Sequence, residues 1–392
     1  MTAIGPNARF LPSISIATPV ARLLVSFMVW LVGTSPLAFG EGTPDFEFRS
    51  AVSGYRYEFP RDHGSHPDYR TEWWYYTGHL RANHGRSFGF ELTFFRRAVP
   101  PDKVKTQPSA WTVNHLFLAH FAVTDISGKR FHFSEKLSRE GLGKAGAEQS
   151  GLRVWIDDWR AEAEPGPTGS HTLVACDETH RLALKLQPAK PPVIHGPAGI
   201  SRKGEGVGQA SHYYSFTRLA TTGSLTIDGD EFEVTGTSWM DHEFGSADLG
   251  AEQVGWDWFS IQLEDESEVM LYRMRLKDGT SDHASSGTAV SADGRKQHLE
   301  VTDFQIESTT SWTSRESGAT YPSRWRLVIP ALDLTMELVP LLDEQELRTS
   351  RSTQVTYWEG AVGVVGTKNG RSIKGQGYVE LTGYAKAFDK KL

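Results

Sequence analysis

The sequence of 392 residues has a single cysteine, Cys176, so no disulfide can form within the chain. A lone cysteine in an apolar run is more often a small buried side chain than a nucleophile. The small disulfide-stapled folds are therefore excluded. With 39% hydrophobic residues, a chain of this length suits two packed cores, because single cores stop growing at about 250–300 residues.

An excess of basic residues is also lacking. There are 41 Lys and Arg against 48 Asp and Glu, for a net charge of -7. Nucleic-acid binding needs a positive surface to meet the phosphates. We therefore expect no nucleic-acid partner. The sequence also has no basic amphipathic segment of the kind that forms a helix on a membrane surface.

Long apolar runs are absent as well. The run 23–32 is about ten residues, whereas a helix that spans a bilayer needs roughly 20. Arg9 and Arg22 are the only charged residues among the first forty, and Ala38-Phe39-Gly40 offers small residues for cleavage. This order of basic, apolar and small residues is typical of a secretory signal peptide. We expect residues 1–40 to be cleaved, the mature protein to be periplasmic or secreted, and no stable membrane span to remain.

Signals for metals and cofactors are weak. Gly204 to Gly208 has glycines at every second position, but it lacks the lysine and the helix of a phosphate-binding loop. The histidines and acids at 62–72 are too loosely spaced for a recognisable zinc site. The sequence therefore predicts neither a metal nor another cofactor.

What the chain has in quantity is glycine and aromatic residues: 38 glycines, 20 phenylalanines and 12 tryptophans. These favour β-structure, because aromatics fit a pleated surface and glycines serve tight turns. Strand-like runs occur before and after a Pro- and Gly-rich stretch at 188–208. We predict an all-β chain with an N-terminal half at 41–190, a crossover at 191–208 and a C-terminal half at 209–392.

A weak internal repeat supports two related halves. The run 73–80 (WWYYTGHL) resembles 256–263 (WDWFSIQL), with aromatics at three matching positions and leucine at the end of each. Each run precedes a strand that ends in arginines, Arg96 and Arg97 in the first half, Arg273 and Arg275 in the second. So long a period fits a duplicated domain rather than a solenoid.

The segment 239–244 (WMDHEF) holds the densest set of reactive side chains. If it is a strand, Trp239, Asp241 and Glu243 share one face, and His242 shares the other with apolar Met240 and Phe244. We expect His242 to face a cavity, where burial would change its protonation. The alternative is a buried histidine held by a backbone partner, with the two acids capping a turn.

Three segments carry a family resemblance: 62–67 (DHGSHP), 71–80 (TEWWYYTGHL) and 239–245 (WMDHEFG). They resemble AttH-type proteins and carotenoid 1,2-hydratases, also called hydroxyneurosporene synthases, whose members are often described as secreted hydrolases. The resemblance runs from about Phe59 to the C-terminus. It implies two lipocalin-like antiparallel β-barrel halves packed together around an apolar cavity.

The resemblance also implies a chemistry, the acid-assisted addition of water to a C=C bond of an isoprenoid, carotenoid or lipid-like substrate. Such a site needs an acid, an aromatic wall that tolerates a carbocation, and a placed water. In the hydratases a histidine, a tryptophan two residues later, a tyrosine and an aspartate are tied to activity. His242 and Tyr272 match two of these, while Phe244 and Met274 stand at the other two positions.

From these observations we expect His242, Asp241 and Tyr272 to be catalytic. We expect Phe244, Trp256, Trp258 and Trp239 to contact a hydrophobic small-molecule ligand. The alternative function is a periplasmic carrier that holds a lipid or pigment without reaction. The lining of the cavity separates the two, because only an enzyme needs a buried carboxyl group at the apolar pocket.

Overall fold

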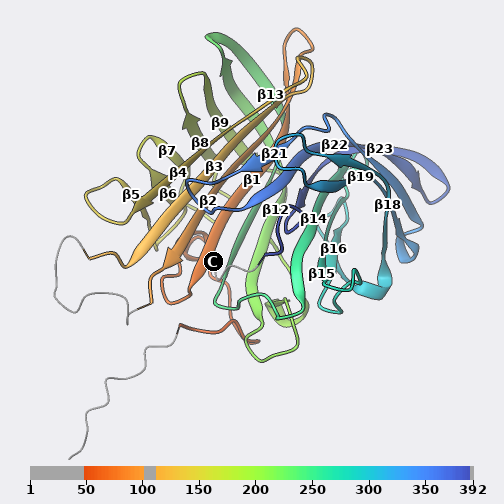
Figure 1. Cartoon of the computed structure of the whole chain (residues 1–392), viewed down its shortest axis with the longest axis horizontal. Helices are drawn as coiled ribbons and strands as arrows, with labels where there is room; N and C mark the ends of the chain where they lie inside the picture. The colour runs from red at the N-terminus through yellow and green to blue at the C-terminus, as the bar shows by residue number, and fades with distance from the viewer. Residues whose placement is uncertain (1–47, 101–111, 389–392) are drawn as a thin grey trace, which may run out of the picture. The chain divides into compact units, whose positions relative to one another are not determined.

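The computed structural model describes residues 48–100 and 112–388. The predicted signal peptide lies outside these residues. The described chain folds almost wholly into antiparallel β-strands in two sheets (Figure 1), and this confirms the all-β prediction. Alternating aromatic and small residues form these strands because one face of each strand is buried against a core.

The first sheet has 13 strands in the order β4-β3-β2-β1-β13-β12-β9-β8-β7-β6-β5, with β10 and β11 added beside β12. Its outer strands β3 and β4 also contact β6, so the sheet curls into a nearly closed barrel. The strands are β1 (Thr71–Ala82), β2 (Ser87–Ala98), β3 (His115–Asp125), β4 (Arg130–Arg139), β5 (Ala145–Ala147), β6 (Arg153–Ile156), β7 (Trp159–Ala163), β8 (His171–Cys176), β9 (His180–Pro188), β10 (Val193–Ile194), β11 (Ser201–Arg202), β12 (Ala210–Ile227) and β13 (Asp230–Gly245).

The second sheet has ten strands in the order β17-β16-β15-β14-β23-β22-β20-β19-β18, with β21 beside β22, and forms a half-barrel. Its strands are β14 (Gln253–Leu263), β15 (Glu268–Leu276), β16 (Ser286–Val290), β17 (Lys296–Glu300), β18 (Gln305–Thr313), β19 (Thr320–Ile329), β20 (Leu334–Pro340), β21 (Glu346–Arg348), β22 (Thr356–Lys368) and β23 (Arg371–Leu381). Short 3₁₀ turns are η1 (Arg61–His63), η3 (Pro197–Gly199), η4 (Val301–Asp303) and η5 (Pro330–Leu332).

The two sheets share one strand order. In each, the first four strands follow one another as a meander, and the first strand also pairs with the last, β1 with β13 and β14 with β23. The repeated aromatic runs 73–80 and 256–263 lie on the equivalent strands β1 and β14. This arrangement agrees with the predicted pair of related halves.

The chain does not pass from the first sheet to the second at the Pro- and Gly-rich stretch. The Pro- and Gly-rich stretch contributes β10 and β11 to the first sheet, and β12 and β13 after it belong to that sheet too. The chain passes to the second sheet between Gly245 and Gln253. Proline and glycine interrupt strands locally, but sheet membership depends on long-range pairing. The division into domains at 191–208 stays a prediction, and it does not coincide with the change of sheet.

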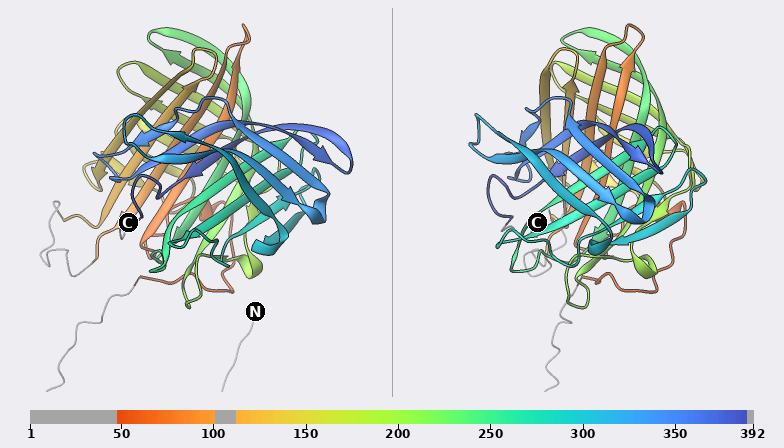
Figure 2. Two further views of the ribbon diagram at one scale, coloured as in Figure 1. Left: turned by 45° about the vertical axis from the view of Figure 1, so that its right-hand side comes forward. Right: turned by 90° about the vertical axis from the view of Figure 1, so that its right-hand side faces the viewer.

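Each sheet encloses its own apolar core, and a third cluster lies where the sheets meet. Because successive side chains of a strand point to opposite faces, β1 sends Trp74 and Tyr76 into the first core. Its neighbours Trp73 and Tyr75 join the third cluster. Figure 2 shows β22 and β23 (blue) crossing the first sheet, and they contact β2 and β1 respectively.

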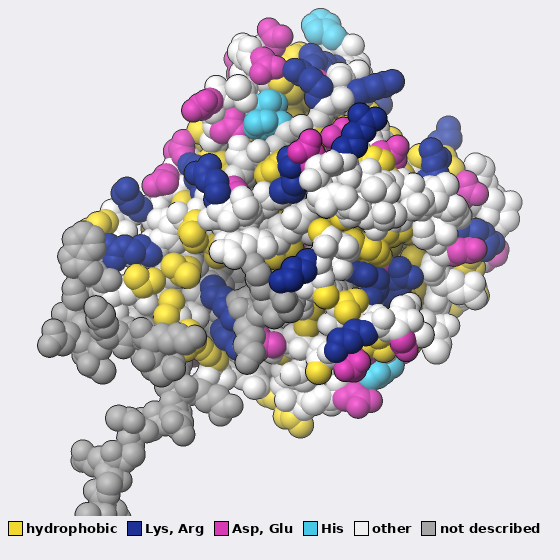
Figure 3. All heavy atoms as spheres, in the orientation of Figure 1, with side chains coloured by type: hydrophobic (Ala, Val, Ile, Leu, Met, Phe, Trp, Pro, Cys, Tyr) yellow, Lys and Arg dark blue, Asp and Glu magenta, His cyan; other side chains and the backbone are white. Residues whose placement is uncertain are grey.

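Acidic and basic side chains are interspersed on the face shown in Figure 3, rather than gathered into a basic patch. Within residues 48–100 and 112–388, no helix has both the length and the apolar character needed to span a bilayer.

Candidate active site

A cavity of about 190 Å³ lies between the two sheets. Its walls come from β1, β2, β12 and β13 on one side and from β14, β15, β22 and β23 on the other. Strand pairing aligns the wall residues of the first sheet in rows. The rows, from the enclosed end outward, are Thr77 with Glu91 and Trp239; Tyr75 with Thr93 and Asp241; Trp73 with Phe95 and Glu243; and Thr71 with Arg97 and Gly245.

Burial changes along these rows. Glu91 and Thr93 are each 1% exposed, whereas Phe95 and Arg97 on the same strand face are partly exposed. The cavity therefore has an enclosed end near Glu91 and an open end near Arg97.

Six carboxyl groups line the cavity: Glu91, Asp241, Glu243, Asp248, Glu359 and Glu380. Glu359 and Glu380 stand directly opposite each other on β22 and β23. Like charges in this arrangement repel each other. The pair therefore favours a state in which at least one carboxyl group is protonated.

Burial raises the pKa of most of these groups. It raises the pKa of Glu380 to about 8, and it raises that of Asp241 to about 7 against the effect of three hydrogen bonds. The pKa of Glu359 is raised by burial and by the nearby Glu91 and Glu380, and the pKa of Glu91 is raised by burial. A charged carboxylate loses its hydration in such a site. The cavity thus holds carboxylic acids near neutral pH.

Two of these acids have an oxygen without a protein partner. Tyr75 donates its hydroxyl hydrogen bond to Oε1 of Glu359 at 2.7 Å, and Thr93 donates to Oε1 of Glu91 at 2.7 Å. The Oε2 atoms of both glutamates are buried and have no hydrogen-bond partner among the described residues. A protonated Oε2 is therefore free to donate to a molecule in the cavity.

Asp241 is held in place by three neighbours. Tyr213 donates to its Oδ2 at 2.7 Å, Trp239 donates to its Oδ1 at 2.6 Å, and Ser215 also donates to Oδ1. Its side chain is 4% exposed. These donors fix the carboxyl group at the cavity wall.

Aromatic rings supply much of the remaining wall. Trp258 donates its indole hydrogen bond to the Tyr213 hydroxyl at 3.1 Å, and its ring meets Tyr75 edge to face at 5.1 Å between centroids. The Nζ atom of Lys203 lies 4.2 Å from the ring centre of Tyr272 and 3.0 Å from a Glu243 oxygen. Ring faces of this kind stabilise a nearby positive charge.

Of the seven residues expected from the sequence, Asp241, Tyr272, Trp256 and Trp258 line the cavity. Trp239 lies beside it, 6.2 Å from Trp258 between ring centroids and bonded to Asp241. The structure therefore brings five of the seven together.

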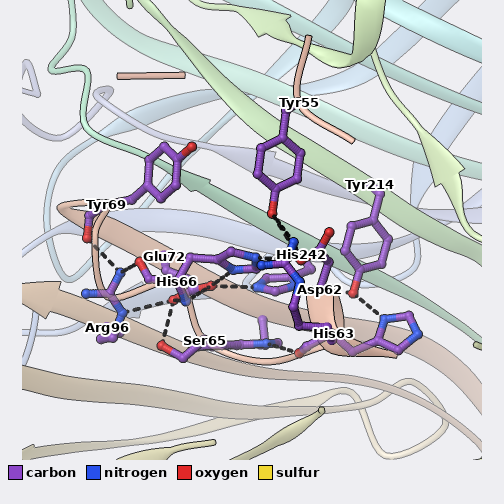
Figure 4. A network of polar contacts seen from close by, with 12 residues as sticks. Tyr55, Asp62, His63, Ser65, His66, Tyr69, Glu72, Arg96, Tyr214 and His242 are labelled. Carbon is purple, nitrogen blue, oxygen red and sulfur yellow. Dashed lines mark hydrogen bonds and ion pairs between the residues drawn. The ribbon is translucent and has the colours of Figure 1, made fainter. Parts of the chain in front are cut away.

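His242 and Phe244 lie on the opposite face of β13, and His242 is part of the polar network drawn in Figure 4. His242 is completely buried, with Nε2 2.9 Å from Glu72 and Nδ1 3.1 Å from the Tyr214 hydroxyl. The ring of Phe244 stacks on His66 at 3.6 Å. The expected two faces of this strand are confirmed, but His242 faces the barrel interior rather than this cavity. A catalytic role for His242 stays a prediction.

The same network binds β1, β2 and the turn η1 together. Glu72 accepts a hydrogen bond from Arg96 at 2.9 Å and lies 2.8 Å from His66. His66, Glu72 and His242 place three ligand-type atoms within 4.8 Å of one another. The Arg96 guanidinium occupies one side of that carboxylate, and a cation there disfavours a metal ion. A partly exposed group, His132, Asp177 and His180, has similar spacing.

Glu91, Glu359 and Glu380 are not among the residues predicted from the sequence. Glu91 and Glu359 are each a single glutamate within a largely apolar run, as in 88–95 (FGFELTFF), while Glu380 lies between Val379 and Leu381. A lone acid at a position with buried neighbours is a usable signal, since charged side chains are rarely buried without a role. The sequence could not show that strands from both sheets bring these three glutamates together.

A serine-hydrolase spacing also occurs, at Gly85-Arg86-Ser87-Phe88-Gly89. In hydrolases this spacing forms a sharp turn from a strand into a helix. Here it forms the hairpin between β1 and β2 and continues as strand β2. The structure therefore provides no nucleophile elbow at Ser87.

Comparisons with known proteins agree with this architecture. A structure from Nitrosomonas europaea, described as AttH, is 34% identical, with a TM-score of 0.77, over 86% of this chain and 99% of its own. Kievitone hydratase from Nectria haematococca is 16% identical, with a TM-score of 0.65, over 87% and 97% of the two chains, and shares the fold. No curated protein matched the sequence. The family model described as AttH-like matches residues 50–384, and the chain therefore belongs to the AttH-like family.

Proposed function

We propose that the protein is a hydratase that adds water to a C=C bond of an apolar substrate in the cavity between the sheets. One observation carries this proposal. Protonated, buried carboxyl groups with free oxygen atoms stand against aromatic walls. An isolated double bond is protonated only by an acid that is present in its protonated form and shielded from water.

The reaction divides into two proton transfers. Glu359 is the proposed donor, because burial and two neighbouring carboxyl groups favour its protonated form. Its proton adds to one carbon and leaves a carbocation on the other. Water then forms a C–O bond to that carbon and gives up a proton to a carboxylate, which we assign to Asp241. A proton then passes from Asp241 to its neighbour Glu359, which restores both groups, so the sum is the addition of one water molecule.

The aromatic walls of the cavity are suited to the positive charge of the carbocation. Trp73, Tyr75 and Trp258 line the cavity near the acids, and aromatic faces stabilise a cation by roughly 0.5–2 kcal/mol each. A nearby ionised carboxylate adds to this effect in a dry site. The arrangement therefore stabilises the carbocation more than the neutral substrate, which is the requirement for catalysis.

The name of kievitone hydratase, which shares the fold, supports this reaction class. The family resemblance supports an isoprenoid, carotenoid or lipid-like substrate. A carrier that holds such a molecule unchanged is the other outcome of the test below. It has no need of several protonated acids at one end of its pocket.

The test uses isotope-labelled water. Wild-type protein is incubated in H₂¹⁸O with unsaturated isoprenoid and fatty-acid mixtures, and products are analysed by mass spectrometry. We expect one labelled hydroxyl group per product molecule, and loss of the product with Glu359→Gln. Exposed Glu344 provides the control, since Glu344→Gln should leave the product unchanged. Unmodified lipid bound to all three proteins would indicate a carrier instead.

A further inference from the structure

The open end of the cavity holds one cation, Arg97, that has no ion-pair partner of its own among the described residues. Of three basic side chains there, Lys203 lies 3.0 Å from Glu243, and Arg70 lies 2.7 Å from Asp248. Arg97 forms no ion pair within the part of the chain that the structure describes. The open end therefore carries an excess positive charge at Arg97, beside two charge pairs that are already satisfied.

Among the described residues, Arg97 uses only part of its capacity to donate hydrogen bonds. Its Nη1 donates to Oγ1 of Thr71 at 3.0 Å, while a guanidinium has five N–H groups. Burial and the neighbouring Arg70 lower the pKa of Arg97 to about 10, and Asp248, which is paired with Arg70, only partly opposes this, so Arg97 stays charged at neutral pH. A carboxylate partner would shift this pKa upward. A partly desolvated guanidinium with free donors is suited to bind a carboxylate through two parallel hydrogen bonds.

The acids lie at the other end of the same strand face. Glu91, Thr93, Phe95 and Arg97 alternate along β2 and all line the cavity. Arg97 stands six positions after Glu91, which is roughly 20 Å along a strand. The cavity therefore has a fixed polarity, with a cation at the open end, aromatic rings between, and neutral acids at the enclosed end.

We propose that Arg97 binds the head group of the substrate and that the substrate is an unsaturated long-chain carboxylic acid. Its apolar tail passes the aromatic rings and its double bond reaches the acids. This inference rests on the proposed function for the reaction at the enclosed end. A carotenoid hydrocarbon has no group for Arg97 to recognise, and a chain much shorter than the cavity could not reach both ends.

The test measures head-group selectivity by binding. Oleic acid and oleyl alcohol share one chain and differ in the head group, and Trp73, Trp256 and Trp258 at the cavity wall report binding by fluorescence. We expect the wild type to bind the acid roughly tenfold or more tightly than the alcohol, as for a charged hydrogen-bonded pair. With Arg97→Gln the ratio should fall to about one, while affinity for the alcohol stays unchanged.

Two further variants make the result specific. Arg97→Lys keeps the charge without the paired donors and should keep part of the selectivity. Arg81→Gln removes an exposed arginine of β1 and should keep all of it. Thermal unfolding of each variant verifies that it is folded. Equal binding of acid and alcohol by the wild type, an unchanged ratio in Arg97→Gln, or no binding of either probe would overturn the proposal.

The binding test and the hydration test can fail independently. Arg97-dependent binding of oleic acid without labelled product would leave the head-group site standing and contradict the hydratase. Hydration of neutral and acidic chains alike, with no effect of Arg97→Gln, would leave the hydratase standing and remove the head-group site.

Discussion

Single residues on β13 have different tasks according to the face that they occupy. Asp241 belongs to the cavity, while His242 belongs to the polar network inside the first barrel. His242→Ala should lower the free energy of unfolding by about 2–4 kcal/mol, because it leaves Glu72 and Tyr214 with unmatched groups and opens a void. Urea titration checks this value, with cavity ligand affinity expected to be unchanged. Lost turnover at unchanged stability would instead support the catalytic role predicted for His242.

The carboxyl groups of the cavity make stability depend on pH in a defined direction. An unfolded glutamate titrates near pH 4, whereas the pKa of Glu380 in the fold is about 8. The folded state thus holds the proton more tightly, so stability is lost as pH rises from about 4 through 8. Glu380→Gln mimics the neutral acid and should match the wild type near pH 5 but melt at a higher temperature near pH 9. Melting curves at both pH values test this, and a constant difference would contradict it.

At the scale of elements, the network around Glu72 joins strand β1 to β2, β13 and the turn η1. Glu72→Gln leaves Arg96, which is 1% exposed, without its charge partner. Breaking a buried pair in this way costs about 3–5 kcal/mol. Glu233→Gln on the exposed end of β13 is the control and should change stability by less than about 0.5 kcal/mol. Chemical denaturation compares the two, and similar stabilities would contradict a structural role for the network.

The strands themselves could be predicted from the sequence because their residue patterns are local. The aromatic runs predicted strands, and the structure has them. An Asp-Gly pair favours a hairpin turn, and Asp228-Gly229 forms the turn between β12 and β13. The alternation of side chains along a strand also predicted which residues share each face of β13. It could not say which face looked into a core and which into a cavity, because each face carries both titratable and large apolar side chains. In the structure Met240 belongs to the first core, and Phe244 packs in a separate cluster with Tyr69 and Ala210.

For the whole molecule, buried ion pairs cross from one sheet to the other. Glu268 of β15 is fully buried, with Lys190 at 2.7 Å and Arg218 of β12 at 2.6 Å. Because these groups lose water only when the sheets meet, we expect residues 48–388 to unfold in one cooperative transition. Differential scanning calorimetry checks this. Two separated transitions, or no loss of melting temperature in Glu268→Ala, would show that the halves are independent.

Export concerns the whole chain too, and it stays a proposal. The basic, apolar and small residues of 1–40 predict cleavage after Gly40. Expression of the full sequence in a bacterial host should give a periplasmic protein that begins at Glu41. Intact mass and N-terminal sequencing of cell fractions measure this, with Arg22→Glu in the basic segment expected to slow export. Recovery of the full-length chain in the cytoplasm would contradict the proposal.

The sequence by itself determined the fold class, the related halves and the family, because strand alternation, turn residues and the 71–80 motif are local features. Four of the residues that it predicted for the site, Asp241, Trp256, Trp258 and Tyr272, line the cavity, while their roles stay predictions. Only the tertiary structure decided that Glu91, from the first sheet, meets Glu359 and Glu380 from the second, and that His242 turns away from them. Which strands face one another depends on long-range pairing, and the pKa of a carboxyl group depends on the burial that this pairing creates.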